Sequence, residues 1–504
     1  MSTPHAVLDE LVTRELAGGR TVGVAVVATD RERVLLETYR GWADVAERRP
    51  VDPDTVFQIG SITKVATAIL AVQQHRAGRL DLRVPVRQYL PWLPERPYGA
   101  ITAHQLLSHT AGLGAGSDAS PPSPYMAFAE YGEPGEFRYS NTGFQVLGMI
   151  VEEVAGRPYP AMLAEDVLGP LGMAASVPAI TGAIRATMAT GYVESPDDLP
   201  FGAGDGLTAA PFFEYDVGDG CMACTARDLA AFARMLANGG AGVLDQAGFE
   251  LLTTPVTDTG NGESICYGVF AKDSYGYPDL NHGGGMVGQQ SMLCVDRETG
   301  IGVVAFVNGI GFPTALVRGV LRALRQERLG EPVTAPEPPP GPTLADYAGD
   351  YQGRTVRLVD GRLHLDGTAL TWLEGDAFAL PGSPYPVRFG RRDGAVVELA
   401  HGPDVWPADG HAAPVARPYP PEWDAYVGQY RAHKPFEPTF RILIRNGTPL
   451  LVWPSGREIE LVPTAQPTTF RLDGRLEAIS FDTPAGPRML RAVLSGCPYF
   501  RPFR

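Results

Sequence analysis

The chain has 504 residues, of which 44% are hydrophobic and 20% charged; this excludes a disordered polymer and suits roughly three folded domains of about 150 residues each. Its net charge of -15 argues against a nucleic-acid partner, because binding a phosphate backbone requires clustered basic side chains. Aromatic residues make up 9% of the chain and have no basic neighbours that would form a stacking surface for bases.

Five cysteines are spread along the chain, an odd and sparse set that fits a reducing compartment better than a disulfide framework. The N-terminus lacks the basic start and apolar run of a secretory signal. No apolar run approaches the roughly 18 residues of a membrane span. We therefore expect a cytoplasmic protein that makes no contact with a membrane.

The first 330 residues mix strand and helix patterns. Strands are predicted over 21–30, 33–44, 292–296 and 302–309; helices are predicted over 65–75, 144–154 and the segment that follows the capping-box sequence Thr225-Ala-Arg-Asp228. Strands at both ends with helices between them predict one α/β domain over residues 1–330. Its terminal strands should meet in a single antiparallel sheet flanked by helices.

Ser61 and Lys64 stand three residues apart at the start of the predicted helix 65–75, so their side chains share one helix face. A serine hydroxyl is a poor nucleophile until a base takes its proton, and a neutral lysine can be that base. The chain has only three lysines, at positions 64, 272 and 434, and uses arginine elsewhere, although arginine effectively cannot give up its proton. The plainer interpretation is an N-cap serine beside a surface lysine; the scarcity of lysine favours chemistry.

Tyr139 and Asn141 lie in a polar, glycine-containing stretch just before the predicted helix 144–154. A tyrosine hydroxyl can move protons when cations lower its pKa, and an asparagine amide can donate to a substrate carbonyl. Taken alone, the tripeptide Tyr-Ser-Asn is better explained as a turn with Asn141 as the N-cap.

His282 begins the run His-Gly-Gly-Gly that ends at Gly285 and leads into the predicted strand 292–296. Glycines on a strand let a ligand backbone approach closely, and the histidine could contact Tyr139 or a substrate. The glycines also fit the dinucleotide pattern G-x-G-x-x-G, but a strand rather than a helix follows, so we exclude that site. A lipase-type oxyanion loop is excluded because the chain has no G-x-S-x-G. By itself His282 is explained equally well as a turn residue.

A proline-rich stretch over residues 331–343 is predicted to be a linker. The segments 344–413 and 422–504 repeat each other, and a second proline-rich stretch, 414–421, separates them. Each has the pattern Y-x-G-x-Y followed by a hairpin signal, Asp360-Gly361 or Asn446-Gly447. We predict two small antiparallel β units, with their tyrosines in core or corner packing rather than in a binding site.

The three motifs in this order resemble those of the serine β-lactamase and penicillin-binding-protein superfamily, on the branch that holds class C β-lactamases, D-aminopeptidases and related esterases. The family pattern is S-x-x-K, then Y-x-N, then K-T-G or H-x-G. The resemblance covers about residues 8–328 and includes the segments 101–113 and 218–236. The two C-terminal β units resemble the lipocalin-like domains that follow the catalytic domain in D-aminopeptidases and in some peptide-cyclising thioesterases.

The resemblance implies a role for each motif residue. Ser61 would be the acylated nucleophile, with Lys64 and Tyr139 as the proton-transfer pair. His282 would tune Tyr139. Three residues are expected to bind the substrate: Asn141, Gly284 and Gly285. The oxyanion hole would consist of the backbone N–H groups at positions 61 and 285, each such donor typically contributing about 3 kcal/mol in the transition state. No cofactor and no metal are implied.

One departure concerns the third motif, because K-T-G members use Lys and Thr to hold a substrate carboxylate and this chain has His282 and Gly283 there. This disfavours β-lactamase and carboxypeptidase activity. We expect a serine hydrolase that acts through an acyl-enzyme on amides or esters, foremost a D-amino-acid amide or short-peptide hydrolase with esterase side activity. Three alternatives remain: an acyltransferase or peptide cyclase, a β-lactamase, and a protein that is acylated once and acts as a sensor or binder. The sequence also leaves a homodimer open.

A cysteine pair and a histidine pair are interpreted as structural residues rather than as parts of a site. Cys221 and Cys224 have no second close pair that would complete a zinc site, so packing is favoured. His104 and His109 are not part of an H-E-x-x-H motif. We expect His109 to be structural, hydrogen-bonded beneath the site.

Overall fold

The computed structural model describes residues 2–114, 132–194, 206–274, 276–334, 342–412, 415–432, 437–475, 477–494 and 497–502. The chain divides into two compact units, Met1–Val193 with Ala209–Pro336, and Glu194–Thr208 with Glu337–Arg504. Most of the predicted linker 331–343, and the start of the second proline-rich stretch, lie outside the described residues. The finer division of the C-terminal region at 344–413 and 422–504 stays a prediction.

A nine-stranded antiparallel sheet forms the centre of the first unit, in the order β3-β2-β1-β13-β12-β11-β10-β9-β8. The strands are β1 (Thr21–Thr29), β2 (Val34–Asp44), β3 (Arg49–Pro50), β8 (Thr257–Asp258), β9 (Glu263–Ile265), β10 (Phe270–Ser274), β11 (Tyr277–Met286), β12 (Gln289–Asp296) and β13 (Gly302–Gly309). Strand β1 pairs with both β2 and β13. The predicted α/β domain, with its two terminal strands meeting in one sheet, is confirmed.

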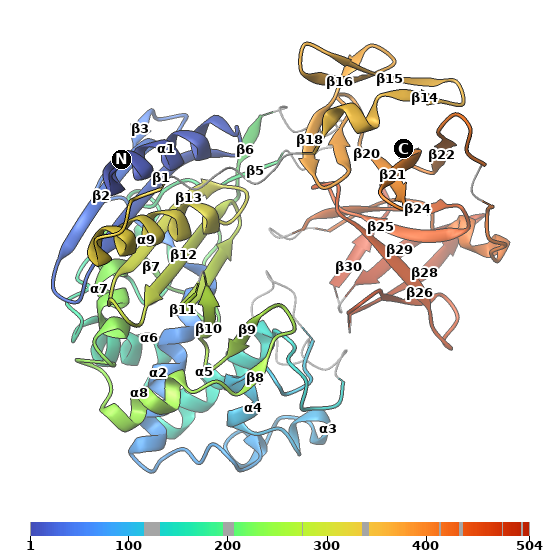
Figure 1. Ribbon diagram of the computed structural model, residues 1–504. Helices are drawn as coiled ribbons and strands as arrows, with labels where there is room; N and C mark the ends of the chain where they lie inside the picture. The colour runs from blue at the N-terminus through green and yellow to red at the C-terminus, as the bar shows by residue number, and fades with distance from the viewer. Residues whose placement is uncertain are drawn as a thin grey trace. The chain divides into compact units, whose positions relative to one another are not determined.

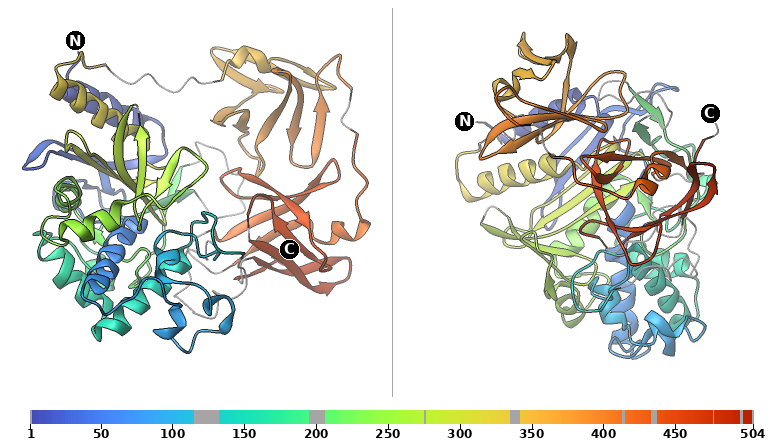
Figure 2. Two further views of the ribbon diagram at one scale, coloured as in Figure 1. Left: turned by 60° about the horizontal axis from the view of Figure 1, so that its bottom comes forward. Right: turned by 90° about the vertical axis from the view of Figure 1, so that its right-hand side faces the viewer.

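Helices cover both faces of this sheet, which is why its central strands are continuous apolar runs. Strand β13 is buried at every position, and β1 at nearly every one. Helices α1 (Pro4–Ala17) and α9 (Thr314–Leu329) lie side by side on one face in Figure 1 and Figure 2, and α7 (Ala226–Ala237) packs against the other. None of the helices in the described ranges is long and apolar enough to cross a bilayer.

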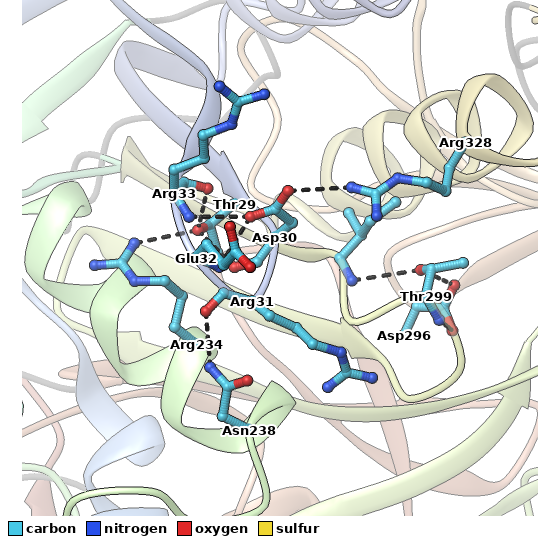
Figure 3. Close-up of polar contacts among 11 residues, drawn as sticks. Thr29, Asp30, Arg31, Glu32, Arg33, Arg234, Asn238, Asp296, Thr299 and Arg328 are labelled. Carbon is cyan, nitrogen blue, oxygen red and sulfur yellow. Dashed lines mark hydrogen bonds and ion pairs between the residues drawn. The ribbon is translucent and has the colours of Figure 1, made fainter.

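The turn between β1 and β2 is tied to helices on both faces of the sheet (Figure 3). Within the turn, the Thr29 hydroxyl donates to the Arg33 carbonyl at 2.7 Å, and a carboxylate oxygen of Asp30 accepts from the Arg33 N–H at 3.0 Å. Arg328 of α9 donates to the other Asp30 oxygen at 3.1 Å, and Arg234 of α7 donates to the Thr29 hydroxyl at 3.1 Å. The first hairpin is thus hydrogen-bonded to both α7 and α9.

The remaining helices, turns and short strands of the first 330 residues lie outside the nine-stranded sheet. The helices are α2 (Thr63–Arg76), α3 (Glu95–Tyr98), α4 (Ala103–Leu107), α5 (Asn141–Ala155), α6 (Tyr159–Met162) and α8 (Gln246–Thr253), with the short turns η1 (Gly60–Ile62), η2 (Val86–Gln88), η4 (Leu163–Leu168) and η5 (Gly182–Ile184). The short strands are β4 (Phe57–Gln58), which pairs with β7 (Ala223–Cys224), and β5 (Tyr192–Glu194) and β6 (Leu207–Ala209). Helix α2 is buried along most of its length, and its buried residues include the polar side chains of Thr63, Lys64 and Thr67.

In the second unit, residues 344–407 form two sheets around one apolar core rather than a closed barrel. The elements are η6 (Leu344–Tyr347), β14 (Gly349–Tyr351), β15 (Arg354–Val359), β16 (Arg362–Leu365), β17 (Thr368–Ala369), β18 (Thr371–Glu374), β19 (Ala377–Ala379), β20 (Val387–Arg392), β21 (Ala395–His401) and β22 (Asp404–Pro407). The two-residue strand β17 is the last strand of the first of these sheets.

A closed barrel of eight antiparallel strands follows, red in Figure 1. After η7 (Pro421–Ala425), its strands are β23 (Gly428–Arg431), β24 (Thr439–Arg445), β25 (Thr448–Val452), β26 (Glu458–Pro463), β27 (Thr469–Leu472), β28 (Ala478–Ala485), β29 (Arg488–Leu494) and β30 (Cys497–Phe500). Buried aromatic rings pack against one another here: Phe440 lies 4.7 Å from Tyr499, and Tyr426 lies 4.5 Å from Phe481, between ring centroids.

The repeated tyrosines have the same role in both parts of the second unit. The Tyr351 hydroxyl donates to the Tyr347 carbonyl at 2.8 Å, and the Tyr430 hydroxyl donates to the Tyr426 carbonyl at 2.9 Å. All four side chains are buried, so they are packing residues, as predicted. Both hairpin turns have positive φ at each central residue, the conformation that Asp-Gly and Asn-Gly favour.

Candidate active site

The predicted pair is formed at the start of helix α2. Ser61 lies in the turn η1, and the ammonium of Lys64, one turn later, donates to the Ser61 hydroxyl oxygen at 2.9 Å. Ser61 is partly exposed, whereas Lys64 is fully buried. A reachable hydroxyl in contact with a buried amine is the arrangement that an activated serine nucleophile requires.

Two glycines let strand β11 approach this serine. Gly60 has φ of +52°, and a Cβ atom there would lie 2.7 Å from the backbone nitrogen of Gly285. At Gly284 a Cβ atom would lie 1.7 Å from the carbonyl oxygen of Ile59. The Ser291 hydroxyl on β12 also donates to Ile59 O, at 2.8 Å. The backbone at position 285 is thereby placed beside the residue that precedes Ser61.

Lys64 has a second hydrogen-bond acceptor that the sequence did not reveal. Its ammonium donates to the backbone carbonyl of Asp219 at 2.8 Å, and it lies 5.1 Å from the centroid of the Tyr139 ring and 5.9 Å from that of Phe144. Asp219 falls inside the segment 218–236 that supported the resemblance. A backbone carbonyl has no side-chain signature, so no residue type in the sequence indicates this contact.

The segment that carries Asp219 is fixed to helix α2 by two threonines. The Thr67 hydroxyl donates to the Gly218 carbonyl at 2.5 Å, and the Thr63 hydroxyl accepts from the Met222 N–H at 3.2 Å. Threonines at 63 and 67 are one turn apart and both fully buried. The helix that presents Ser61 and Lys64 therefore also holds the acceptor for the Lys64 amine.

Tyr139 is positioned by His109. The ring centroids of the two residues are 4.4 Å apart, and the Nδ1 atom of His109 accepts the Ser140 N–H at 3.0 Å. Burial, followed by the nearby charge of Lys64, lowers the pKa of His109 well below its usual value. His109 thus acts as a neutral support beneath Tyr139, the position expected of it.

Asn141 is the first residue of helix α5, and Ser140 rather than Asn141 is its N-cap. The Ser140 hydroxyl accepts the Gly143 N–H at 3.0 Å, which is the capping bond. The expectation that Asn141 is the N-cap is therefore wrong, because Ser140 takes that position.

His282 lies on β11, buried between two aromatic rings. Its ring centroid is 6.4 Å from that of Tyr139 and 5.2 Å from that of Phe270. Burial, followed by the charge of Lys64, lowers the pKa of His282 to about 3. The structure therefore brings Ser61, Lys64, Tyr139 and His282 into one site, with Asn141 and the glycines 284 and 285 at its border.

Strand β11 has an unpaired edge at this site within the described residues. Strand β10 pairs with β11 only from Tyr277 to Asn281, whereas β12 continues to Met286 on the other side. The backbone of residues 283–286 thus lacks a strand partner on the side of β10. An extended substrate backbone can bind along such an edge.

The two neighbouring cysteines and the other two lysines are not part of this site. Cys221 and Cys224 are buried free thiols whose pKa values burial raises. Lys272 on β10 forms an ion pair with Glu263 at 3.4 Å, and Lys434 lies outside the described residues. Among the residues that the structure describes, no three His, Cys, Asp or Glu side chains are grouped as a metal site.

The chain belongs to the Beta-lactamase family: the model of that family matches residues 8–326. It is 30% identical over 335 residues to penicillin-binding protein 4 of Amycolatopsis lactamdurans, a match that covers 60% of this chain and 86% of that protein. It is also 30% identical over 193 residues to esterase EstB of Burkholderia gladioli, covering 33% of this chain and 49% of the esterase.

Solved structures share the fold. The octameric penicillin-binding protein homologue from Pyrococcus abyssi has a TM-score of 0.57 at 20% identity, covering 98% of this chain and 99% of that chain. The D-amino acid amidase from Ochrobactrum anthropi has a TM-score of 0.54 at 24% identity, covering 64% of this chain and 99% of the amidase. Family and fold together make the protein a serine hydrolase of the β-lactamase and penicillin-binding-protein superfamily.

Proposed function

We propose that the protein hydrolyses the amide bond of D-amino-acid amides or short peptides through an acyl-enzyme on Ser61, with ester hydrolysis as a side activity. The contact of 2.9 Å between the Lys64 amine and the Ser61 hydroxyl carries this proposal. In its neutral form the Lys64 amine can accept the Ser61 proton across this contact. The named amidase and esterase relatives support amide and ester substrates.

Catalysis begins when the Ser61 oxygen attacks the substrate carbonyl carbon and its proton passes to Lys64 or Tyr139. The carbonyl oxygen becomes an oxyanion, held by the backbone N–H groups of Ser61 and Gly285. Tyr139 then protonates the leaving amine as the C–N bond breaks, which leaves the acyl group on Ser61. In reverse, Tyr139 activates the water that releases the acid.

β-Lactams are disfavoured as substrates because the residue at the K-T-G position carries no positive charge. The pKa of about 3 keeps His282 neutral near pH 7. A substrate carboxylate there would meet no cation at position 282, and burying a charge without its own partner costs several kcal/mol. Amides and esters that lack this carboxylate do not meet that cost.

The test is a substrate panel with matched variants. D- and L-phenylalaninamide, a nitrophenyl ester and a chromogenic cephalosporin are compared at equal enzyme concentration. We expect turnover of the D-amide and the ester, an ester burst equal to the enzyme concentration, and loss of both in Ser61→Ala but not in Ser264→Ala on β9. Full activity of purified Ser61→Ala would refute the mechanism.

Products also separate hydrolysis from acyl transfer. With an added amine, hydrolysis leaves only the free acid, whereas transfer yields the corresponding new amide. A burst followed by no turnover would instead indicate a protein that is acylated only once. Each outcome selects one of the alternatives.

A further inference from the structure

One residue beside the site, Asp219, has its backbone oxygen and its side-chain oxygens bound by different partners. Its backbone carbonyl accepts a hydrogen bond from the Lys64 amine at 2.8 Å. Its carboxylate accepts from the Tyr215 hydroxyl, which lies 2.9 Å from one carboxylate oxygen and 3.0 Å from the other. Lys64 therefore contacts the uncharged oxygen of Asp219, while a tyrosine hydroxyl binds the carboxylate.

Tyr215 is fixed through both its backbone and its hydroxyl. Its backbone N–H and carbonyl exchange two hydrogen bonds of 2.8 Å with Ile180. The Gln145 amide on helix α5 donates to the Tyr215 hydroxyl oxygen at 3.4 Å. Tyr215 and Asp219 are both buried. Because Tyr215 is held in this way, its hydroxyl stays at one place and directs the carboxylate toward it.

The backbone on either side of Asp219 is closely packed. A Cβ atom at Gly218 would lie 3.1 Å from the carbonyl oxygen of Phe144 on helix α5. A Cβ atom at Gly220 would lie 3.4 Å from the ring of Tyr215. With the backbone confined, the Asp219 carbonyl stays on Lys64, and rotation of the side chain is the remaining way in which Asp219 can rearrange.

A negative charge close to Lys64 would work against its role, because the amine must be neutral when it accepts the Ser61 proton. A carboxylate within about 4–6 Å of an amine favours the charged form of that amine. Apart from Asp219, the titratable side chains that the structure describes around Lys64 are not carboxylates: Tyr139, His109 and His282. The direction of the Asp219 side chain therefore decides whether an anion meets the amine.

Two buried side chains near Asp219 experience its charge. Burial raises the pKa of Cys221 and of Tyr159, and the charge of the Asp219 carboxylate adds to both shifts. A raised pKa keeps the thiol and the phenol protonated, and so uncharged, near pH 7. Neither of the two supplies a positive charge, so they do not compete with Tyr215 for the carboxylate.

We propose that Tyr215 is a positioning residue for the reaction: its hydroxyl holds the Asp219 carboxylate away from Lys64, so that the amine can take the Ser61 proton. The inference rests on the proposed role of Lys64 as the base. Without that hydroxyl, rotation of the Asp219 side chain brings its charge toward the amine. An ion pair formed there opposes transfer of the proton from Ser61 to Lys64.

The test is the pH dependence of Ser61 acylation in the full-length protein. The rate of the nitrophenol burst with nitrophenyl acetate is measured from about pH 5 to pH 9. In Tyr215→Phe we expect the acidic limb of this profile to move to higher pH by about 1–3 units, which lowers the rate at pH 7 by about 10-fold or more. Tyr267→Phe is the matched control, since it removes a buried hydroxyl that contacts His104, and its limb should not move.

Adding Asp219→Asn to Tyr215→Phe separates the effect of charge from a general effect on packing. The double variant still lacks the tyrosine hydroxyl but has no carboxylate to approach Lys64. Its acidic limb should return to within about half a pH unit of the original position. An unmoved limb in Tyr215→Phe, or the same shift with and without Asp219→Asn, would overturn the inference.

Asp219→Asn alone keeps the inference testable if Tyr215→Phe does not fold. With Tyr215 present the carboxylate is already held away from the amine, so its removal should move the limb by less than about half a pH unit. A larger move to lower pH would mean that the carboxylate acts on Lys64 in the intact protein, against the inference. The proposed amide hydrolysis fails by a different result, the absence of D-amide turnover, on which the ester profile does not depend.

Discussion

The amine of Lys64 donates to the hydroxyl of Ser61 at 2.9 Å and to the carbonyl of Asp219 at 2.8 Å, so one buried amine links the nucleophile to a loop more than 150 residues away. No carboxylate forms an ion pair with Lys64 among the described residues. Its two oxygen acceptors are neutral, and its aromatic neighbours Tyr139 and Phe144 contribute only their ring faces. Both hydrogen bonds that hold the amine in place are thus made to uncharged oxygens.

Replacing Lys64 by arginine is therefore expected to abolish most of the activity. Arginine keeps the charge but cannot accept the Ser61 proton, and general-base catalysis typically contributes about 10²- to 10⁴-fold. The check is kcat/KM for D-phenylalaninamide, with Lys272→Arg, in a partly buried ion pair with Glu263, as the matched control. Near-normal turnover in Lys64→Arg would remove Lys64 from the role of base.

Tyr139→Phe separates protonation of the leaving group from nucleophile activation. Amide cleavage needs a proton on the leaving nitrogen, whereas nitrophenolate leaves readily without one. We expect a loss of about 10²- to 10⁴-fold on the amide and a clearly smaller loss on the nitrophenyl ester. Equal losses on both substrates would place Tyr139 at the Ser61 step instead. Tyr267→Phe, at a hydroxyl that contacts His104, is the control.

Gly284→Ala tests whether β11 must touch the segment before Ser61. The added Cβ atom would lie 1.7 Å from Ile59 O, so the strand has to move and carry the Gly285 N–H away from the nucleophile. Loss of one oxyanion donor typically costs about 10²- to 10³-fold in kcat. At Gly349 a Cβ atom finds its nearest neighbour at 3.7 Å, so Gly349→Ala should leave kcat unchanged. A normal kcat in Gly284→Ala would argue against this oxyanion hole.

The sequence predicted those parts of the site that depend on side-chain type and spacing. The three-residue spacing of Ser61 and Lys64 sets their contact because a helix repeats locally. The Asp219 carbonyl and the close approach at Gly284 are backbone relationships between distant segments, and no residue pattern encodes them. Likewise, the repeat of Y-x-G-x-Y predicted two β units, but closure into a barrel depends on strand pairing across the whole unit.

The two buried histidines should make the protein less stable as the pH falls. His282 has a pKa of about 3 when folded and about 6.5 when unfolded. Between these values the unfolded chain binds the extra proton, so the free energy of unfolding decreases as the pH is lowered, by up to about 1.4 kcal/mol per pH unit. His109 acts in the same direction. Urea unfolding at pH 6 and pH 5 measures the slope, and His282→Gln should reduce the drop by about 1 kcal/mol relative to the unsubstituted protein. An identical drop in both proteins would mean that His282 is already protonated in the folded state, because only a group that gains its proton on unfolding contributes to the slope.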